Sequence, residues 1–583
     1  MTNNINLVEL VNQALGFVKT KEYDKAMAIY KSILEKDSMH PQALSNLSII
    51  YLMKEQYIEA VDTINKSLKV LTPIIGDYQN LATAYIALKE YESAIKAYKN
   101  IIKMNTNTPG VYKLLGDAQS EVVDHIGAID SYRKALKLEP TKFESIYDYG
   151  SILAICLHHD EALKYLRAAQ KIDSDHIECR NKIARSLSAI GNYEEAKAIY
   201  QKLMELVPEA VGPNIDYASC LIYQRKYEEA VKILKEALIR KPNNNMARTN
   251  LAMVYLLNKK FKDGWEHLDA RILFRNQRDV TKRYDMLKLF FDIDIDKKEL
   301  KADEKIIILL DAGLGDTILG LSMIKEFHKK FKNISAEVDY RLVDLCKRSF
   351  PDIDFYAVHE NRHELLIDYD LSLFDKGIYW GSIGKYLRQG IADFPKKEIA
   401  FLSPDKSKIN TINNKLKREK NIICGISWKS SAYEGRHKKA QLEDFLPIFK
   451  LKEISFLDLQ YEVKNEVGQT ALEKEKLYKE KNIIIEDYED IDKYEDIDDL
   501  TALVSNCDII VTCSNVTAHI AGALGKKTFL FVPFQRGRLW YWHDEEGPSI
   551  WYPSIKIFTA DCNDGWGTIF DKIAYTIKRE LKL

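Results

Sequence analysis

The stretch YIEAVDTINKSLKVLTPIIGDYQNLATAYIALKEY, residues 57–91, contains one full period of a pattern that runs through the first half of the chain. A tyrosine stands at each end, and each tyrosine precedes an alanine by three residues. In steps of 34 residues, without insertion or deletion, the small residue recurs at Ala26, Ala60, Ala94, Ala128, Ala162, Ala196, Ala230 and Gly264. The ring recurs at Tyr23, Tyr57, Tyr91, His125, His159, Tyr193, Tyr227 and Phe261. Self-similarity at a fixed period predicts an array of similar structural units.

A second series of small residues and three prolines define what each unit contains. The series is Ala14, Ser48, Ala82, Gly116, Gly150, Ala184, Ala218 and Ala252. Two antiparallel helices approach closely only where side chains are small, so we expect one helix pair per unit, with the ring filling the gap at the turn. Pro140, Pro208 and Pro242 share a third register and stop the second helix before the next unit begins. Eight helix pairs are predicted over residues 7–273.

This pattern resembles the tetratricopeptide repeat, and the resemblance implies an all-α superhelix whose groove holds a peptide. One further register is expected to face the concave side: Asn12, Asn46, Asn80, Leu114, Asp148, Lys182, Asp216 and Asn250. An asparagine amide both donates and accepts hydrogen bonds, so it can hold a peptide backbone whatever the side chains are. The register resembles the asparagine ladder of O-GlcNAc transferases, which makes its four asparagines candidate acceptor-binding residues. Leu114 and Lys182 break the ladder, and a tolerant polar helix position is the alternative.

Composition places the chain among ordinary folded proteins. Its 583 residues are too many for one hydrophobic core, so two to four domains are expected. With 46% apolar residues, 29% charged residues and 14 prolines, the chain is not of a disordered or fibrous type. A formal net charge of −1 gives no general electrostatic reason to bind nucleic acid or an anionic membrane. Any phosphate-binding site must therefore be local.

Cysteine usage and the first residues predict a cytoplasmic location. The eight cysteines are scattered, with no CxxC pair and no spacing suited to zinc, so reduced and mostly buried thiols are expected. The start, MTNNINLVELVNQALGFVKTKEY, lacks a basic region, an apolar core and a cleavage site. No stretch approaches the length of a transmembrane segment.

Beyond a charged, helical connector expected around residues 274–304, the periodicity changes to alternating strands and helices. The expected strands are Lys305–Asp311, Glu337–Arg341, Ile422–Trp428, Ile454–Gln460, Asn482–Asp487, Cys507–Cys513 and Lys527–Pro533. Helices are expected over residues 318–331 and 515–525, the latter ended by Gly525. This alternation predicts two doubly wound, Rossmann-like lobes over residues 305–415 and 420–583.

Ligands of such sheets bind beyond the carboxyl ends of the strands, where helix N-termini point into the crevice. Ser514, Asn515, Val516 and Thr517 occupy that place in the second lobe. A helix start offers unpaired N–H groups and a positive dipole end, which suit a diphosphate. Helix capping is the alternative role for Ser514 and Asn515. His519 lies one turn further on, where a lone histidine is more often packed than functional.

Several stretches resemble the heptosyltransferase-like glycosyltransferases. GLGDTILGLSMIKEF, which begins at Gly313, resembles their opening motif, and the block from Asp498 to Pro533 resembles their nucleotide-sugar-binding motif. GISWKSS, LQY with Gln460, and RGRLWYWHDEEGPSIWYPSIKIF extend the match. With FKDGWEHLDARI at the last repeat, the chain is similar to bacterial repeat-linked glycosyltransferases, some of which modify flagellin or other proteins. The match is thin between about residues 345 and 420.

The resemblance implies a GT-B unit that takes a nucleotide-sugar co-substrate and needs no metal or other cofactor. The first lobe would receive the acceptor and the second the donor. The aspartate of the GD motif takes the acceptor proton in the related enzymes, and Asp316 stands at that position, where a carboxylate can act as a general base. An N-cap is the alternative role for Asp316. Gly313, Gly315, Gln460 and the residues from Ser514 to Thr517, with His519, would contact the donor.

Basic residues and one departure from the family motif bear on donor binding. Lys429, Arg436 and Lys438 follow the GISW strand, where the family places cations that neutralise charge on the departing nucleotide. Solvated surface is the alternative for each of them. Ser514 and Asn515 replace the Asp-Thr that is common in heptosyltransferases, which bears on the identity of the donor.

Two acidic stretches and a pair of glycines allow rival interpretations. The aspartates over residues 292–296 and 490–499 lie in charged, irregular surroundings and are interpreted as solvated surface rather than a metal-binding DxD motif. Gly313 and Gly315 with Glu337 or Asp339 match part of the spacing of a dinucleotide site, but the third glycine is replaced by isoleucine. A transferase acting on a surface glycan or lipopolysaccharide precursor and a non-catalytic repeat adaptor are rival functions that the sequence leaves open.

Overall fold

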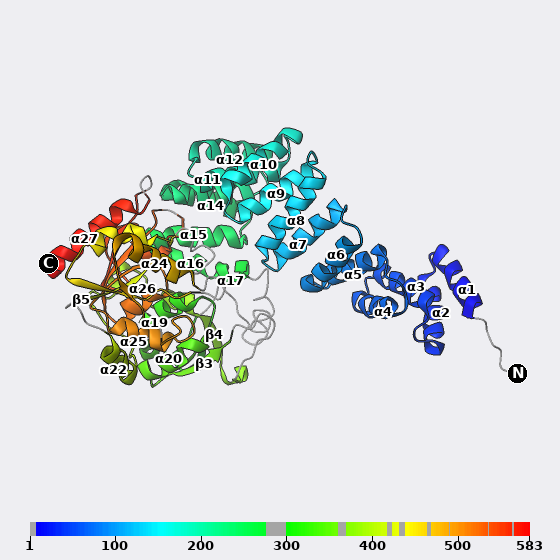
Figure 1. Ribbon diagram of the computed structural model, residues 1–583. Helices are drawn as coiled ribbons and strands as arrows, with labels where there is room; N and C mark the ends of the chain where they lie inside the picture. Colours follow the sequence, from blue (N-terminus) through cyan, green and yellow to red (C-terminus); the bar gives the residue numbers. More distant parts are fainter. Residues whose placement is uncertain are drawn as a thin grey trace. The chain divides into compact units, whose positions relative to one another are not determined.

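The computed structural model describes residues 7–275, 299–359, 369–416, 422–430, 438–462, 468–488, 490–534, 536–561 and 565–583. These residues belong to two compact units, Met1–Pro213 and Asn214–Leu583 (Figure 1). The predicted connector lies largely outside the described residues. The division falls inside the repeat array, so that the last two repeats belong to the same unit as the α/β part.

The first unit consists of six consecutive helix pairs. Their helices are α1 (Leu7–Lys19), α2 (Tyr23–Lys36), α3 (Pro41–Met53), α4 (Tyr57–Val70), α5 (Ile75–Ala87), α6 (Tyr91–Met104), α7 (Pro109–Glu121), α8 (His125–Leu138), α9 (Phe143–Ile155), α10 (His159–Ile172), α11 (Ile177–Ala189) and α12 (Tyr193–Leu206). The array continues with α13 (Gly212–Tyr223), α14 (Tyr227–Arg240), α15 (Asn245–Leu257), α16 (Phe261–Leu268) and α17 (Ala270–Arg275). Together these helices form a tetratricopeptide-repeat array, as predicted.

The periodic residues occupy the positions that their chemistry requires. Every predicted ring is the first residue of the second helix of its pair, and each register proline lies two residues beyond the end of that helix. The alanines of both small registers are buried, at 1% exposure or less. A Cβ on Gly150 would lie 3.1 Å from the backbone nitrogen of Leu166, and one on Gly116 would lie 2.9 Å from the ring of Tyr132. Larger side chains would therefore separate the helices.

The turn within each pair carries a register that the sequence did not reveal. Two residues before each ring, the backbone enters the left-handed region, with φ between 57° and 83°. The residues are Lys21, Glu55, Lys89, Val123, Leu157, Gly191, Arg225 and Lys259. Glycine would be the usual choice for this conformation, but it stands at one of the eight positions.

The α/β part contains two sheets. The first has the order β3-β2-β1-β4 and is parallel, with β1 (Lys305–Leu309), β2 (Asn333–Asp339), β3 (Asp354–Val358) and β4 (Lys376–Tyr379). The second has the order β10-β11-β9-β8-β5-β6-β7 and is parallel except at β10. Its strands are β5 (Ile422–Ser427), β6 (Ile454–Asp458), β7 (Ile485–Glu486), β8 (Ile509–Cys513), β9 (Lys527–Val532), β10 (Gly547–Pro548) and β11 (Ile555–Thr559).

The strand order of each sheet reverses direction at one place. In the first sheet the chain moves outward from β1 to β3 and then returns to place β4 on the other side of β1. In the second sheet β6 and β7 extend on one side of β5, and β8, β9 and β11 extend on the other. Open α/β sheets bind ligands at such switch points, beyond the carboxyl ends of the strands. The turns after β1, β5 and β8 are therefore the places where a site is expected.

The helices of the α/β part are α19 (Leu314–Lys330), α20 (Val343–Ser349), α21 (Gly384–Leu387), α22 (Lys406–Lys415), α23 (Leu446–Phe449), α24 (Gln469–Lys481), α25 (Ile497–Ser505), α26 (Val516–Ala523) and α27 (Gly567–Leu581). Short 3₁₀ helices include η1 (Tyr340–Leu342) and η7 (Trp540–Trp542).

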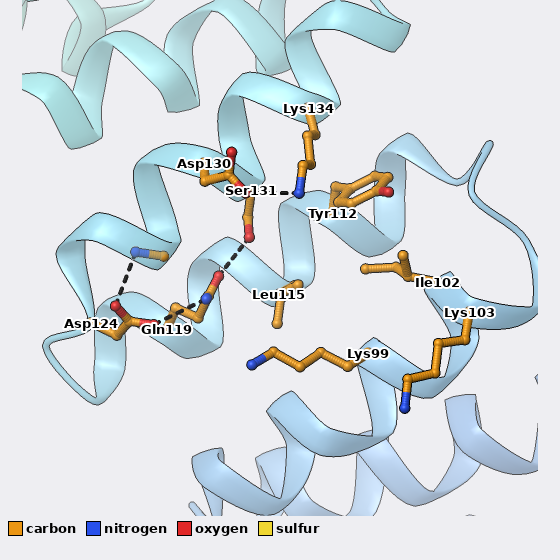
Figure 2. A pocket seen from close by; sticks show the side chains of 11 residues that line it. Lys99, Ile102, Lys103, Tyr112, Leu115, Gln119, Asp124, Asp130, Ser131 and Lys134 are labelled. Atoms are coloured by element: carbon orange, nitrogen blue, oxygen red, sulfur yellow. Dashed lines mark hydrogen bonds and ion pairs between the residues drawn. The ribbon is translucent and has the colours of Figure 1, made fainter.

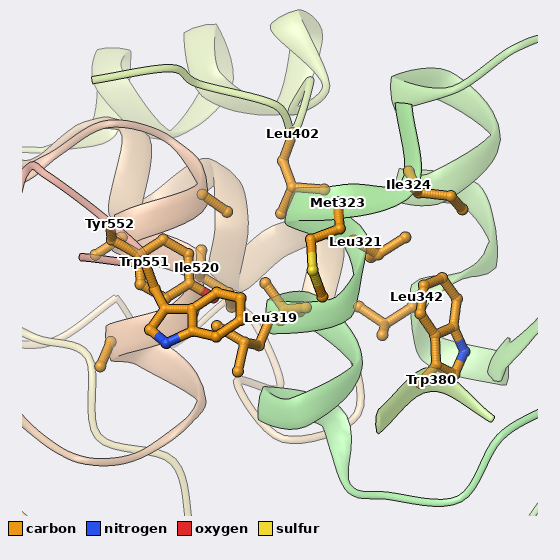
Figure 3. Close-up of a cluster of buried hydrophobic side chains, with 14 of the residues drawn as sticks. Leu319, Leu321, Met323, Ile324, Leu342, Trp380, Leu402, Ile520, Trp551 and Tyr552 are labelled. Carbon is orange, nitrogen blue, oxygen red and sulfur yellow. The ribbon is translucent and has the colours of Figure 1, made fainter. Parts of the chain in front are cut away.

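A continuous hydrophobic core joins both sheets through α19 and α26. Leu319 and Met323 of α19 lie in one cluster with Ile520 of α26 and with Leu402 and Trp551 (Figure 3). A second cluster covers the opposite face of the larger sheet. Both faces of that sheet are thus buried, which explains why the sequences of its strands are continuous apolar runs.

Several predicted boundaries were wrong. The helix predicted over residues 318–331 begins at Leu314, so the GLGD motif is its first turn rather than a loop before it. The second strand begins at Asn333 and ends at Asp339, because Tyr340 and Arg341 enter a 3₁₀ helix. Within Asn482–Asp487 the strand is confined to Ile485–Glu486, since Asn482 caps α24 with φ of 55°.

Candidate functional site

The first candidate turn follows β1 at the switch point of the smaller sheet. Asp311 forms an ion pair with Arg271 of α17 and accepts a hydrogen bond from the backbone of Gly381 at 3.4 Å. Gly313 is the N-cap of α19, and Asp316 lies in the first turn of this helix. The N-cap alternative for Asp316 is therefore wrong. Its carboxylate lies at the positive end of a 17-residue helix, which stabilises the ionised form.

The second candidate turn follows β8 at the switch point of the larger sheet. Asn515 is the N-cap of α26: its Oδ1 accepts from the backbone of Ala518 at 3.3 Å. Its Nδ2 donates to Ser427 Oγ at 2.7 Å and to the carbonyl of Lys429 at 3.1 Å. Asn515 therefore caps the helix, as its alternative role anticipated, and also ties the turn after β8 to the turn after β5. The first N–H groups of α26 begin at Val516.

Gln460 holds the turn after β5 in place. Its Oε1 accepts hydrogen bonds from Ser427 Oγ at 3.2 Å, from the backbone of Trp428 at 3.0 Å and from the backbone of Lys429 at 2.8 Å. Gln460 is itself 5% exposed. Gln460, which was predicted to contact the donor, therefore holds the backbone of the turn after β5 through these hydrogen bonds.

The two candidate turns meet across α19 and α26. A Cβ on Gly315 would lie 2.8 Å from Cδ2 of His519, so glycine allows the histidine ring to lie directly against the first turn of α19. Tyr541 lies close enough to Asp316 for the charge of the carboxylate to raise the pKa of the phenol, and Tyr552 Oη lies 3.0 Å from His519 Nδ1. Residues from the GLGD motif and from the AHIAGALG helix thus share one cluster.

Charge at this cluster is set by burial. His519 is 2% exposed, and burial, together with the charge of nearby Lys438, lowers its pKa to about 3. The imidazole is therefore neutral at physiological pH, with a polar contact to Tyr552. Burial and the charge of Asp316 raise the pKa of Tyr541 well above its ordinary range, so the phenol stays protonated beside the carboxylate.

The remaining predicted donor residues lie around the same turns. Lys438 is buried, at 5% exposure, and Lys429 forms an ion pair with Glu473 of α24. Neither is solvated surface, so that alternative is wrong for both. The Thr517 hydroxyl is fully buried and has no hydrogen-bond partner among the described residues, which is uncommon for a buried polar group. Arg436 lies outside the described residues.

Three residues of the cluster were missed by sequence reasoning as individual site residues. Tyr541, Trp542 and Tyr552 lie in the long stretch RGRLWYWHDEEGPSIWYPSIKIF, which was singled out for its resemblance alone. Trp542 Nε1 donates to Ser514 Oγ at 2.8 Å, so Ser514 is also engaged. The density of aromatic residues in this stretch was the available signal.

The structure argues against the rival interpretation as a dinucleotide site, because the carboxylates proposed to bind the ribose are engaged elsewhere. Glu337 is fully buried, and its carboxylate accepts from the backbone of Leu310 at 2.7 Å and from Tyr369 Oη at 2.6 Å. Asp339 caps η1 and forms an ion pair with Arg341 at 2.8 Å. Both carboxylates are thus used within the first lobe.

The acidic run over residues 490–499 is more than solvated surface. Asp498 forms an ion pair with Arg348 of α20, and Asp499 one with Lys408 of α22 at 2.8 Å. Asp496 caps α25. Within the described ranges, no three His, Cys, Asp or Glu side chains converge in a way that would hold a metal ion. The earlier run, over residues 292–296, lies outside those ranges.

The residues of the ladder register differ in exposure, and several of them are engaged by neighbouring side chains. Asn12 is exposed, and Asn46, Asn80, Asp148 and Lys182 are partly exposed. Asp148 forms an ion pair with Lys113 at 3.2 Å, which replaces an amide rung by a charged one. In the second unit, Asn250 Nδ2 donates to Ser219 Oγ at 3.1 Å.

A hollow in the first unit lies between the second helices of neighbouring repeats, away from the ladder register. It measures about 460 Å³ and is lined by α6, α7 and α8 (Figure 2). Gln119, where other repeats carry a ring or leucine, bonds to Ser131 at 2.6 Å and to Asp124 at 3.1 Å. Lys134 lies 5.8 Å from the centre of the Tyr112 ring. This hollow was not predicted.

The fold defines a tetratricopeptide-repeat protein in which the repeats are followed by an α/β unit with parallel sheets. Residues 78–108 match the family model "Tetratricopeptide repeat", and residues 130–286 match the model "Coatomer epsilon subunit". Protein FlbA of Caulobacter vibrioides is 24% identical over 440 residues, covering 72% of this chain and 70% of FlbA. That aligned length exceeds the length of the repeats, so the similarity extends beyond them.

Other similar proteins are named or described as repeat proteins. TPR repeat-containing thioredoxin TTL4 of Arabidopsis thaliana is 25% identical over 215 residues, or 36% of this chain and 30% of that protein. The solved structure of YrrB, described as a TPR protein with an unusual peptide-binding site, is 22% identical with a TM-score of 0.28, covering 30% of this chain and 91% of YrrB. The C-terminal part of a repeat protein from Cytophaga hutchinsonii is 17% identical with a TM-score of 0.35, covering 41% of this chain and 99% of that one.

Two further properties of the described residues concern membrane insertion and thiol chemistry. Among these residues, none of the helices combines the length and the apolar character needed to cross a bilayer. Each of the seven described cysteines is a buried thiol, as predicted.

Proposed function

We propose that this chain is a glycosyltransferase that moves a sugar from a nucleotide-sugar donor to a protein acceptor recruited by the repeats. The observation that carries the proposal is the meeting of two helix N-termini, α19 and α26, each directly after a strand at a switch point. Asp316 belongs to one and the proposed phosphate-binding turn to the other, with Gly315 against the ring of His519.

The turn from Ser514 to Thr517 is proposed to bind the donor diphosphate. The first N–H groups of α26 and the positive end of its dipole suit an anion. Buried Lys438 adds a positive charge near the same turn, as its effect on His519 indicates. Such fixed donors and charges stabilise the phosphate as it leaves, without reorganisation at the moment of reaction. The unit is proposed to be of the GT-B type and to need no metal.

Asp316 is proposed to take the proton of the acceptor hydroxyl as it attacks the anomeric carbon. The carboxylate is partly exposed, lies beside Tyr541 and is placed on the first turn of a helix. The bond to the acceptor oxygen forms while the bond from the anomeric carbon to the diphosphate breaks, and the nucleotide leaves with its phosphates. A carboxylate within reach of the hydroxyl is the geometry that general-base catalysis requires.

The repeats are proposed to hold the acceptor chain through the asparagine register. The resemblance names flagellin among the acceptors of such enzymes, and we propose a protein acceptor of that kind, modified in the cytoplasm. A glycan or lipopolysaccharide acceptor would leave the repeats without a role in substrate binding.

The proposal is tested by thermal unfolding of the full chain with a panel of nucleotides and nucleotide sugars. A ligand that binds the folded state alone stabilises it by about 2.7 kcal/mol at a concentration 100 times its Kd. Asp316→Asn should keep the stabilisation by the donor and abolish transfer to an acceptor. If no nucleotide sugar raises the melting temperature of the wild-type chain, the transferase proposal is wrong and a repeat adaptor remains.

A further inference from the structure

Residues 540–545, here called the coupling segment, have contacts in two directions. The segment contains η7 and the three residues that follow it, with the sequence Trp-Tyr-Trp-His-Asp-Glu. Its first three residues are aromatic and its last two are acidic. Two of these side chains contact the proposed transferase site, and the other four contact the last two repeats or residues that pack against them.

Tyr541 and Trp542 contact the proposed site. Trp542 Nε1 donates to Ser514 Oγ at 2.8 Å, and Tyr541 lies beside Asp316, whose charge raises the pKa of the phenol. Both rings pack on His519, with centroids at 5.3 Å and 5.2 Å. Tyr541 is 2% exposed and Trp542 is fully buried. One short segment therefore touches the proposed base, the phosphate-binding turn and the histidine between them.

Trp540, Asp544 and Glu545 contact the last two repeats. The Trp540 ring meets that of Trp265, on α16, edge to face, with centroids 5.5 Å apart. Asp544 accepts a hydrogen bond from Tyr227 and lies 3.6 Å from Arg225, at the start of α14. Glu545 forms an ion pair at 2.7 Å with Lys259, in the turn between α15 and α16.

The residue between the two groups has an unusual backbone conformation. His543 has φ of 39° and ψ of 172°, a region that residues with a side chain rarely adopt. Arg538 donates to its carbonyl, and its ring lies 6.1 Å from that of Phe261 on α16. Burial lowers the pKa of His543 to about 4, so the ring is neutral at physiological pH. Contacts on both sides hold this strained residue, and it lies where the segment passes from the site to the repeats.

We infer that residues 540–545 transmit the position of the last two repeats to the proposed transferase site, with Tyr541, packed on His519 against the first turn of α19, as the residue that positions Asp316. The function of Asp316 within this inference rests on the proposed glycosyl transfer. The mechanical link between repeats and site does not. An acceptor that moves α14 or α16 would displace Asp544, Glu545 and Trp540, and with them Tyr541 and Trp542.

This link gives the repeats a second role in addition to recruitment. A displacement of about 1 Å in a catalytic group can cost about 100-fold in rate, so small shifts of the segment are sufficient to regulate transfer. Binding of an acceptor to the last two repeats would thereby change the positions of Asp316 and of the turn from Ser514 to Thr517 together. The acceptor class that this favours is a folded or extended protein that contacts repeats seven and eight.

The link is tested by hydrogen exchange of the full chain, followed by mass spectrometry of its peptides. Asp544→Asn removes the charge that faces Arg225 and Arg538, and Lys259→Gln breaks the exposed pair with Glu545. Glu443→Gln is the matched control, because it breaks a comparable surface pair with Lys476, at 2.7 Å, elsewhere in the same unit. We expect both junction variants to speed exchange about tenfold over residues 311–317 and 514–519, and the control to leave these peptides unchanged.

The outcomes separate the link from the proposed function. Exchange that rises only near residues 225–227 and 540–545, or that rises equally over α24, overturns the link. Neither result depends on transferase activity. Where transfer is measurable, Tyr541→Phe should lower kcat about 10- to 100-fold and leave donor Kd unchanged. An equal loss of donor affinity would overturn the positioning role of Tyr541.

Discussion

Trp265→Ala tests whether the last repeat is a structural part of the α/β unit. The indole is 3% exposed and donates to the carbonyl of Arg388 at 2.6 Å. It packs against Gly384, where a Cβ would lie 2.4 Å from the ring, and meets Trp540 edge to face. Truncation of a buried tryptophan costs about 3–5 kcal/mol, and the carbonyl of Arg388 loses its partner as well.

The assay uses the distribution of tryptophans along the chain. All seven lie at or after residue 265, so their fluorescence reports on the unit Asn214–Leu583 and not on the first six repeats. With an m-value near 3 kcal/mol/M, a loss of 3–5 kcal/mol lowers the urea midpoint by about 1–1.7 M. Trp265→Phe should lose less, because it keeps an aromatic ring in the same space.

The control is Tyr575→Ala on α27, where the side chain is 67% exposed. If Trp265→Ala shifts the midpoint no more than this control does, the last repeat is a separable module. Residues 540–545 would then contact a repeat that is not fixed to the α/β part, and the proposed link would fail.

Three further outcomes follow from local geometry. Val123→Gly should stabilise the first unit by about 1 kcal/mol in thermal unfolding, since Val123 has φ of 62° and is 53% exposed; Val122→Gly, at φ of −91°, should destabilise it. His519 and His543 have pKa values lowered to about 3 and 4, so the unfolded state binds their protons at a higher pH than the folded state does. Their contribution to the stability of the second unit is therefore complete only well above pH 6.5 and falls as the pH falls; between pH 6.5 and 5 each should cost about 1.6 kcal/mol, and His543→Gln should remove its share of that slope in urea midpoints. Gly315→Ala should weaken transfer if the first turn of α19 must lie against His519; full activity would contradict this packing.

The repeats were predictable because their signal is repeated. Each helix pair requires the same small residues at the same spacing, so eight weak signals add to one strong signal. The left-handed turn residues escaped prediction because their conformation is imposed by the two helices that they join. Lys89 and Val123 carry no local preference for it.

The α/β part was predictable in outline and less so in detail. Buried parallel strands give continuous apolar runs that a sequence displays, but their ends depend on pairing. Ile485–Glu486 is short because β7 is an edge strand that pairs with β6 alone. The helix start at Leu314 was missed because GLGD contains two glycines, which disfavour a helix in isolation. Here the close approach of His519 requires glycine at position 315.

The contacts of the site could not be predicted from the sequence, because they join residues that are far apart along the chain. Asp316 and Ser514 are separated by almost 200 residues, and each could be explained alone as a local feature of a helix start. Trp542 donates to Ser514, and its neighbour Tyr541 lies beside Asp316. Both rings also pack on His519, so two adjacent aromatic residues contact both helix N-termini. Because Trp540 and Asp544 fasten the same segment to the repeats, the geometry of the site and the placement of the last repeats have a common determinant.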